Sequence, residues 1–96
     1  MDREVIWTDP AWDDLESAAS YIERDSAFYA AAFVQQIKAA AASLAYFAER
    51  GQIVPEFGDD TVRELLVGSY RLVYSLSANQ VVILALVHGA QRQRRF

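Results

Sequence analysis

The first quarter of the chain combines a short apolar run with a longer stretch in which apolar residues recur at helical spacing. Residues Val5–Thr8 fit a short strand. Asp9 can cap a helix, and Pro10 suits its first turn, because proline lacks the amide hydrogen that stays unpaired there. The helix is predicted to run to about Arg24. Its apolar stripe consists of Trp12, Leu15, Ala19 and Ile22.

A second helix is predicted after a break at Asp25, with Ser26 as its N-terminal cap. The alanine run Ala39–Ala42 allows another helix to approach closely. Gly51, directly after Arg50, is predicted to end this helix, because glycine is common just past helix ends. Its expected buried face consists of Phe33, Ile37, Ala40, Ala41, Leu44 and Phe47. The two helices are therefore expected to form an antiparallel hairpin.

The last third of the chain is predicted to form three strands, which span residues 61–67, 70–77 and 80–88. Gly68-Ser69 fits a two-residue hairpin turn, and Ala78-Asn79 is predicted to close the second hairpin. Residues 52–60 are predicted to be a loop. The order β-α-α-β-β-β predicts an α+β fold in which an antiparallel sheet packs against the helical hairpin.

The two turns determine which residues share a face of the sheet, because side chains alternate between faces. Two-residue turns pair Val67 with Tyr70 and Ser77 with Gln80. Continued along the hairpin, the second pairing predicts that Ser75 faces Val82, Val73 faces Leu84, Arg71 faces Leu86 and Ser69 faces His88. The face expected to pack on the helices carries Leu65, Val67, Tyr70, Leu72, Tyr74, Leu76, Val81, Ile83, Ala85 and Val87. The opposite face, which we name the second face, carries Glu64, Leu66, Arg71, Val73, Ser75, Val82, Leu84, Leu86 and His88. A three-residue second turn would move His88 to the helix side.

The second face is expected to be a binding surface with possible chemistry. It is largely apolar, and helices on one side of the sheet leave it uncovered, so we expect a partner or a second copy to cover it. It also carries Glu64, Arg71 and His88, with Arg92 just beyond. Histidine is the usual general acid or base near neutral pH, a carboxylate can orient it, and arginine can hold a phosphate. This set is adequate for metal-free RNA cleavage, in which a ribose 2′-hydroxyl attacks the adjacent phosphate.

Each of these residues also has a purely structural interpretation. Glu64 and Arg71 can form a plain cross-strand ion pair. His88 can be a strand-end histidine that is satisfied by the backbone. The C-terminal arginines, which can form a solvated or partner-binding tail, are Arg92, Arg94 and Arg95.

Composition restricts the class of protein. Ninety-six residues, of which 53% are hydrophobic and 23% charged, are expected to form one globular domain. Without cysteine and with a single histidine, neither a disulfide framework nor a transition-metal site is expected, and no cofactor is predicted. The charged N-terminus is unlike a signal peptide and no apolar run is long enough to span a membrane, so the cytoplasm is the expected location.

Charge is distributed unevenly along the chain. Residues 1–64 hold all 13 acidic and five basic residues, a net charge of −8, whereas residues 65–96 hold four arginines and no acid, a net charge of +4. This asymmetry indicates either an acidic partner or nucleic acid at the C-terminal part, or two halves that neutralise each other in the fold. The acidic pI of about 4.8 argues against broad contact with phosphates.

Short motifs along nearly the whole chain resemble the RelE/ParE superfamily, the toxins of bacterial type II toxin–antitoxin pairs. Their order and spacing carry the resemblance more than any single one does. The motifs are Ala11-x-x-Asp14-Leu15, Tyr21-Ile22, Ala31-x-Phe33, Gly51-x-x-Val54-Pro55-Glu56, Arg63-Glu64, Tyr70-Arg71-Leu72-Val73-Tyr74 and His88-Gly89.

The resemblance implies a small toxin that is held inactive by an acidic, partly disordered antitoxin. Such antitoxins lay a helix or an extended segment across the toxin surface, and neither a membrane nor direct DNA binding is expected. The residues expected to bind the antitoxin are Leu66, Arg71, Val73, Val82, Leu84, Leu86, Arg92, Arg94 and Arg95.

The superfamily divides by target, and the resemblance implies two alternatives. ParE-like members inhibit DNA gyrase, whereas RelE-like members cleave mRNA on the ribosome with basic residues. Here Arg71, His88 and Arg92 would form the nuclease set, with Glu64 orienting them. The acidic pI and the absence of lysine after Lys38 favour the ParE-like, non-enzymatic alternative. A third hypothesis is a degenerate member that only binds its antitoxin and co-regulates their operon.

Overall fold

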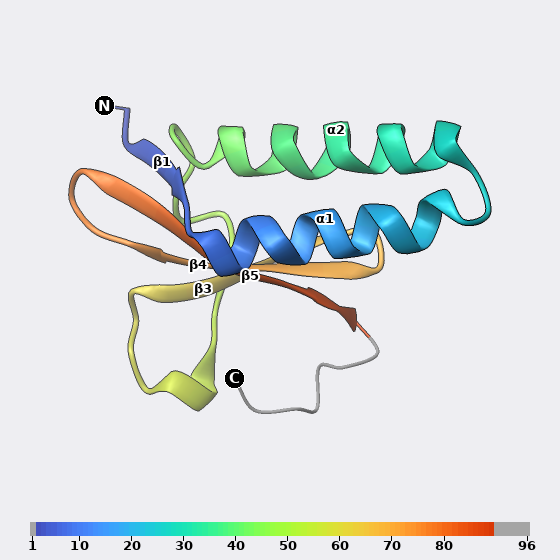
Figure 1. Cartoon of the computed structure of the whole chain (residues 1–96). Helices are drawn as coiled ribbons and strands as arrows, with labels where there is room; N and C mark the ends of the chain where they lie inside the picture. The colour runs from blue at the N-terminus through green and yellow to red at the C-terminus, as the bar shows by residue number, and fades with distance from the viewer. Residues whose placement is uncertain (1, 90–96) are drawn as a thin grey trace.

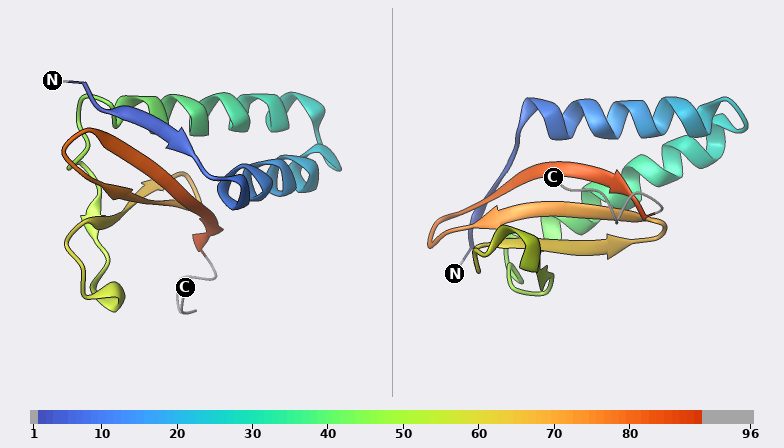
Figure 2. Two further views of the ribbon diagram at one scale, coloured as in Figure 1. Left: turned by 60° about the vertical axis from the view of Figure 1, so that its left-hand side comes forward. Right: turned by 90° about the horizontal axis from the view of Figure 1, so that it is seen from below.

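A computed structural model describes residues 2–89, in which two helices pack on one face of a five-stranded sheet (Figure 1). The elements are β1 (Glu4–Trp7), α1 (Asp9–Glu23), α2 (Ala27–Ser43), β2 (Gln52–Ile53), the 3-10 helix η1 (Pro55–Phe57), β3 (Val62–Val67), β4 (Tyr70–Leu76) and β5 (Gln80–His88). Figure 2 shows the helical hairpin as one layer and the sheet as the other. The predicted α+β fold is confirmed.

The strand order of the sheet is β1-β5-β4-β3-β2. The last three strands are antiparallel, as predicted. β1, however, lies parallel to β5, so the sheet is mixed and not wholly antiparallel. A parallel pair needs a long crossover connection, and the two helices supply part of it. The predicted loop at residues 52–60 is also partly wrong, because it contains β2 at the sheet edge and η1 beyond it.

Each helix begins at a residue whose side-chain oxygen accepts a hydrogen bond from the first turn. At α2 this residue is Ser26, which accepts from the Tyr29 amide, as predicted. At α1 the cap is Thr8 and not Asp9, because the Thr8 hydroxyl accepts from the Ala11 amide. Either residue type can cap a helix, and the end of β1 at Trp7 leaves Thr8 in the extended conformation that a cap requires.

Two details of the predicted helix faces are wrong. α2 ends at Ser43 and not at Gly51, so Phe47 lies beyond the helix and its side chain is exposed. In α1 the buried side is rotated by about one residue from the predicted stripe, which leaves Trp12 37% exposed. The buried residues of α1 are Ala11, Leu15 and Ala18.

The register between β4 and β5 changes part of the way along the hairpin. Ser75 lies opposite Val82, as predicted, and Tyr74 lies opposite Ile83. A β-bulge follows, with Leu84 as the extra residue, so that Val73 lies opposite Ala85. The predicted pairs of Val73 with Leu84, Arg71 with Leu86 and Ser69 with His88 are therefore wrong.

The bulge reverses the face of every later residue of β5. Leu86 belongs to the core beneath the helices, and His88 lies opposite Tyr70, on the same side. Ala85 and Val87 move to the second face in their place. The prediction that Leu86 and His88 lie on the second face is therefore wrong. It assumed a regular hairpin, and the extra residue of the bulge shifts both by one position relative to β4.

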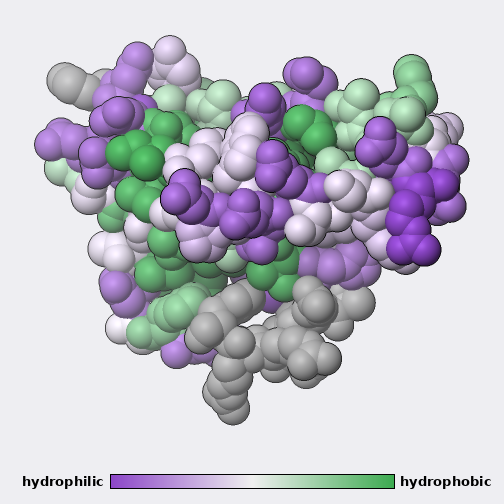
Figure 3. Space-filling model, viewed as in Figure 1, coloured by the Kyte–Doolittle hydropathy of each residue, from purple (hydrophilic) through white to green (hydrophobic). Residues whose placement is uncertain are grey.

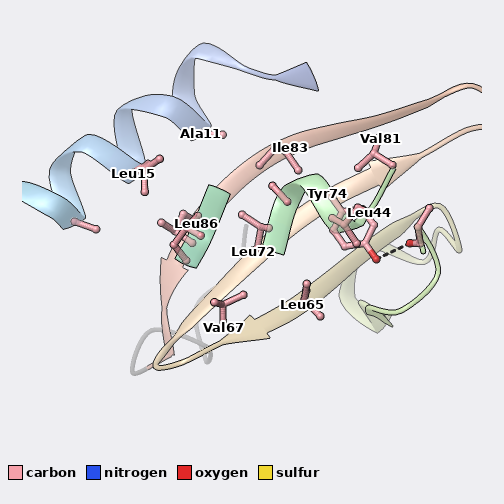
Figure 4. Close-up of a cluster of buried hydrophobic side chains, with 14 residues drawn as sticks. Ala11, Leu15, Leu44, Leu65, Val67, Leu72, Tyr74, Val81, Ile83 and Leu86 are labelled. Atoms are coloured by element: carbon pink, nitrogen blue, oxygen red, sulfur yellow. Dashed lines mark hydrogen bonds between the residues drawn. The ribbon is translucent and has the colours of Figure 1, made fainter. Parts of the chain in front are cut away.

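The main core lies between the helices and the sheet (Figure 4). Tyr74 is its largest fully buried side chain, and its hydroxyl donates to the Ala48 carbonyl oxygen at 2.7 Å. α1 also covers the edge of β5 beyond β1: the Thr8 hydroxyl donates to the Ile83 oxygen and the Leu86 amide donates to an Asp14 carboxylate oxygen. These bonds satisfy backbone groups that the bulge and the end of β1 leave without a strand partner.

Candidate functional site

Two charged side chains lie at the centre of the second face. Leu66 of β3 lies opposite Arg71 of β4, and Glu64 lies opposite Val73, so Glu64 and Arg71 are diagonal neighbours. An Arg71 Nη2 donates to a Glu64 carboxylate oxygen, and the two side chains are only 3% and 11% exposed. The ion pair expected from sequence is therefore present, and it is buried. Burial makes the pairing necessary, because a charge without a partner in the interior is costly.

The segment between β2 and β3 covers part of the second face. Val54 is fully buried there and packs with Val62 and Val73 in a second, smaller cluster. Leu84 and Ala85 are partly buried against this cluster. In Figure 1 this segment, with η1, lies on the side of the sheet opposite the helices. The expectation of an entirely uncovered second face is wrong for the region over β3 and β4.

This covering segment is held at its start by residues of the sheet. The Gly51 amide donates to the Tyr74 hydroxyl at 3.0 Å, and an Arg63 Nη1 donates to the Gly51 oxygen at 3.0 Å. Burial raises the pKa of Tyr74 above its usual value. The hydrogen bond from Gly51 lowers this pKa, but burial has the larger effect. At the other end, Asp59 accepts hydrogen bonds from the amide and hydroxyl of Thr61, which lower the pKa of its carboxyl group.

His88 lies away from the ion pair. Its ring contacts Tyr70 edge-on, with centroids 5.0 Å apart, and Tyr70 in turn contacts Phe33 of α2 at 4.9 Å. Burial, and to a lesser extent Tyr21, raises the pKa of Tyr70. Because directly opposite residues of a strand pair share a face, His88 lies on the helix side and Arg71 on the second face. The sheet therefore separates the two residues expected to act together in RNA cleavage.

The residues expected to bind an antitoxin differ in their accessibility. Leu66 is 56% exposed, and Val82 and Leu84 are half-buried. Arg71 and Val73 are buried, and Leu86 faces the helices. The remaining expected residues lie outside the described residues; these are Arg92, Arg94 and Arg95. Leu66, Val82 and Leu84 are the accessible apolar part of the predicted surface.

Within residues 2–89, no three metal-ligating side chains lie close enough to hold an ion, and no helix has the length and apolar character needed to cross a bilayer. The paired charges on the second face are tied to each other, and the accessible residues beside them are apolar.

Sequence reasoning missed two parts of this site. The sequence predicts a plain loop at Val54, and no local signal marks this residue as buried, because its equally apolar neighbour Ile53 is exposed. The sequence predicts a helix end at Gly51, whereas a Cβ there would lie 2.5 Å from the Tyr74 hydroxyl oxygen and 2.7 Å from the Glu64 backbone oxygen. Its role is close approach to the sheet, for which only glycine has room.

Comparison with known proteins agrees with this fold. Residues 5–93 match the family model described as the ParE toxin of the type II toxin–antitoxin system parDE. Toxin RelE2 of Caulobacter vibrioides is 34% identical over 89 residues, which cover 92% of this chain and 97% of that protein. Two solved structures are similar in fold. The chromosomal ParDE system from P. aeruginosa has a TM-score of 0.74 at 21% identity and covers 90% of this chain and 95% of its own. The RelBE2 toxin–antitoxin complex from Mycobacterium tuberculosis has a TM-score of 0.60 at 23% identity, with coverages of 92% and 99%.

Proposed function

The chain belongs to the ParE toxin family of type II toxin–antitoxin systems, and from that premise we propose that it arrests growth by inhibiting DNA gyrase as a binding protein. The observation that carries this choice is the β-bulge in β5. By placing His88 on the helix side, the bulge separates the imidazole from Arg71, whose guanidinium is already bonded to Glu64. General acid–base catalysis requires the groups within hydrogen-bond reach of the same substrate atoms.

The alternative is a ribosome-dependent mRNA endonuclease. It is favoured by one observation, the 34% identity to a protein named Toxin RelE2. In that case His88 and Arg71 would need to act on one RNA from opposite faces of the sheet, with Arg92 supplying a further cation.

The two functions are separated by pulse-labelling after induction of the chain without its antitoxin. Early loss of thymidine incorporation with translation intact supports gyrase inhibition. Early loss of methionine incorporation would overturn it. The His88→Gln variant sharpens the test, because this exposed side chain can change without disturbing the core. Toxicity should persist in His88→Gln if no proton transfer is required, whereas RNA cleavage should fall by about 10²-fold or more. Purified gyrase with the purified chain then provides a direct supercoiling assay.

For the antitoxin, we propose an apolar segment flanked by acidic residues that covers the accessible part of the second face. Exposed Leu66 is its anchor, since exposed apolar side chains on a sheet are typical of partner surfaces. Leu66→Glu should weaken capture of the chain by its antitoxin by at least 10-fold. The matched control is Ile53→Glu, because Ile53 is exposed too but lies opposite Arg63, on the other side of the sheet. Equal affinity for both variants would remove Leu66 from the interface.

A further inference from the structure

The end of β5 lies beside the uncovered part of the second face. Val87 shares a row across the sheet with Arg71 and Leu66, because directly opposite residues of paired strands lie on the same face. Two residues later, the Gly89 amide donates to the Ser69 carbonyl oxygen. A Cβ at Gly89 would lie 2.8 Å from that oxygen, so glycine allows the chain to approach the turn between β3 and β4 closely. The chain therefore leaves the sheet within two residues of the row that contains exposed Leu66.

Residues 90–96, which lie outside the described residues, have the sequence Ala-Gln-Arg-Gln-Arg-Arg-Phe. They carry three positive charges, no acid and one large apolar side chain. Seven residues can span about 23 Å when extended. β3 is two strand spacings, or about 10 Å, from β5, and the region of the second face around Ala85 lies about 13 Å back along β5 from Gly89. Residues 90–96 are therefore long enough to cross the second face.

The covering segment, residues 54–61, has the opposite charge. It carries three carboxylates and no basic residue. The carboxylate of Asp59 accepts two hydrogen bonds from Thr61. Glu56 and Asp60 are exposed, and they form no ion pair with a basic side chain within residues 2–89. These two carboxylates are therefore suitable partners for the arginines of residues 90–96.

An apolar contact can accompany these charges on the covering segment but not on α1. Phe57 lies between Glu56 and Asp60 in the sequence and is 38% exposed, so it can pack against Phe96, the one aromatic residue of 90–96. α1 also carries exposed carboxylates, and Figure 3 shows hydrophilic side chains across the front of the molecule, over this helix. The hollow beside those carboxylates is lined only by polar residues. α1 therefore complements the arginines alone, whereas the covering segment complements both the arginines and Phe96.

The attachment of residues 90–96 to β5 allows weak contacts to hold them. A single exposed ion pair contributes little, because water and salt screen it. Here three arginines act together, and their attachment to Gly89 gives them an effective concentration of about the millimolar range beside the covering segment. The contact should weaken in salt, because the Debye length falls from about 8 Å at physiological ionic strength to about 3 Å at 1 M.

We propose that residues 90–96 fold back across the second face and dock on the covering segment, with Phe96 beside Phe57 and the arginines facing Glu56 and Asp60. This docking does not depend on which protein the chain inhibits. It has a consequence that rests on the proposed function: a partner that covers the second face, such as the antitoxin segment anchored at Leu66, has to move residues 90–96 aside.

A nitroxide label locates residues 90–96 directly, because the chain has no cysteine that would compete for the label. In Gln93→Cys the label lies between two arginines and leaves all three in place. In NMR spectra of the dilute full-length chain, we expect the backbone amides of Glu56 and Asp60 to lose most of their signal, while those of Asp13 and Glu16 on α1 keep theirs. The reverse pattern would place the segment on α1 and overturn the proposal, as would equal broadening of all four amides. The same loss in a mixture of labelled chain with unlabelled, isotope-enriched chain would overturn it too, because the contact would then join separate copies.

Neutral variants test the charges that hold the segment. Glu56→Gln/Asp60→Asn should reduce the signal loss at the Phe57 amide by about 3-fold or more, because it removes the ion-pair partners of the arginines. The matched control Asp13→Asn/Glu16→Gln removes the same charge from α1 and should leave the loss unchanged. All four residues are exposed, and circular dichroism confirms that each variant is folded. If Glu56→Gln/Asp60→Asn kept the full signal loss, these carboxylates would not hold the segment and the proposal would fail.

Discussion

The hydroxyl of Tyr74 joins the helical layer, the covering segment and the sheet, and its removal is the most informative test of the fold. It donates to the Ala48 oxygen at 2.7 Å and accepts from the Gly51 amide at 3.0 Å. Both bonds are buried, and the Tyr74 side chain is fully enclosed. Tyr74→Phe removes the hydroxyl and keeps the ring, so it leaves one buried acceptor and one buried donor without this partner.

The expected loss of stability follows from those two groups. A buried polar group without a hydrogen bond costs about 1–3 kcal/mol, and the sheltered ring limits access of replacement water. We therefore expect Tyr74→Phe to lower the free energy of unfolding by about 2 kcal/mol. For a chain of this size the corresponding decrease in Tm is about 8–16 °C.

Urea unfolding followed by circular dichroism measures this change, and amide hydrogen exchange locates it. Exchange of the Gly51 amide should become faster than that of amides in the centre of β4. Tyr46→Phe is the matched control, because Tyr46 is 65% exposed and should change stability by less than about 0.5 kcal/mol. If Tyr74→Phe were as stable as Tyr46→Phe, the two hydrogen bonds would not hold the covering segment in place.

Three further predictions concern the same region. Gly51→Ala should destabilise the chain by more than about 2 kcal/mol, since the new Cβ would meet the Glu64 backbone oxygen at 2.7 Å. At Gly58 a new Cβ would meet nothing within 4 Å, so Gly58→Ala should cost only about 1 kcal/mol of stability for placing alanine in a left-handed backbone conformation. Equal decreases in Tm for Gly51→Ala and Gly58→Ala would contradict this reasoning. Glu64→Gln should lower the free energy of unfolding by about 3 kcal/mol, measured by urea unfolding, because it breaks a buried ion pair. The control Glu56→Gln, at an exposed residue, should leave this free energy almost unchanged. Because burial raises the pKa values of Tyr70 and Tyr74, the folded chain holds these protons more tightly than the unfolded chain; stability should fall as pH rises above about 10, and less steeply in Tyr74→Phe.

Local patterns predicted most of the fold. The Ser26 cap and the Gly68-Ser69 turn depend on neighbouring residues only, and both are confirmed. The ends of the helices were less predictable, because Thr8 and Asp9 can both cap a helix and the choice depends on where β1 ends. α2 ends at Ser43, well before Gly51, and Gly51 instead donates to the hydroxyl of Tyr74, a contact between residues 23 apart that local patterns do not predict. Glycine at that point has the appearance of a helix stop, although its role is close packing.

The candidate site was predictable up to the β-bulge and not beyond it. The Gly68-Ser69 turn alone determines that Glu64 and Arg71 are diagonal neighbours on one face of the sheet. The structure shows the ion pair that this arrangement allows. The position of His88 depends on an extra residue at Leu84, for which the apolar sequence around it has no local signal. One inserted residue therefore separates two side chains that a regular hairpin would bring together.

What remains on the second face is a buried ion pair beside accessible apolar residues, an arrangement that can bind a partner without catalysis. The bulge, more than any single side chain, is the observation on which the proposal of a binding toxin rests.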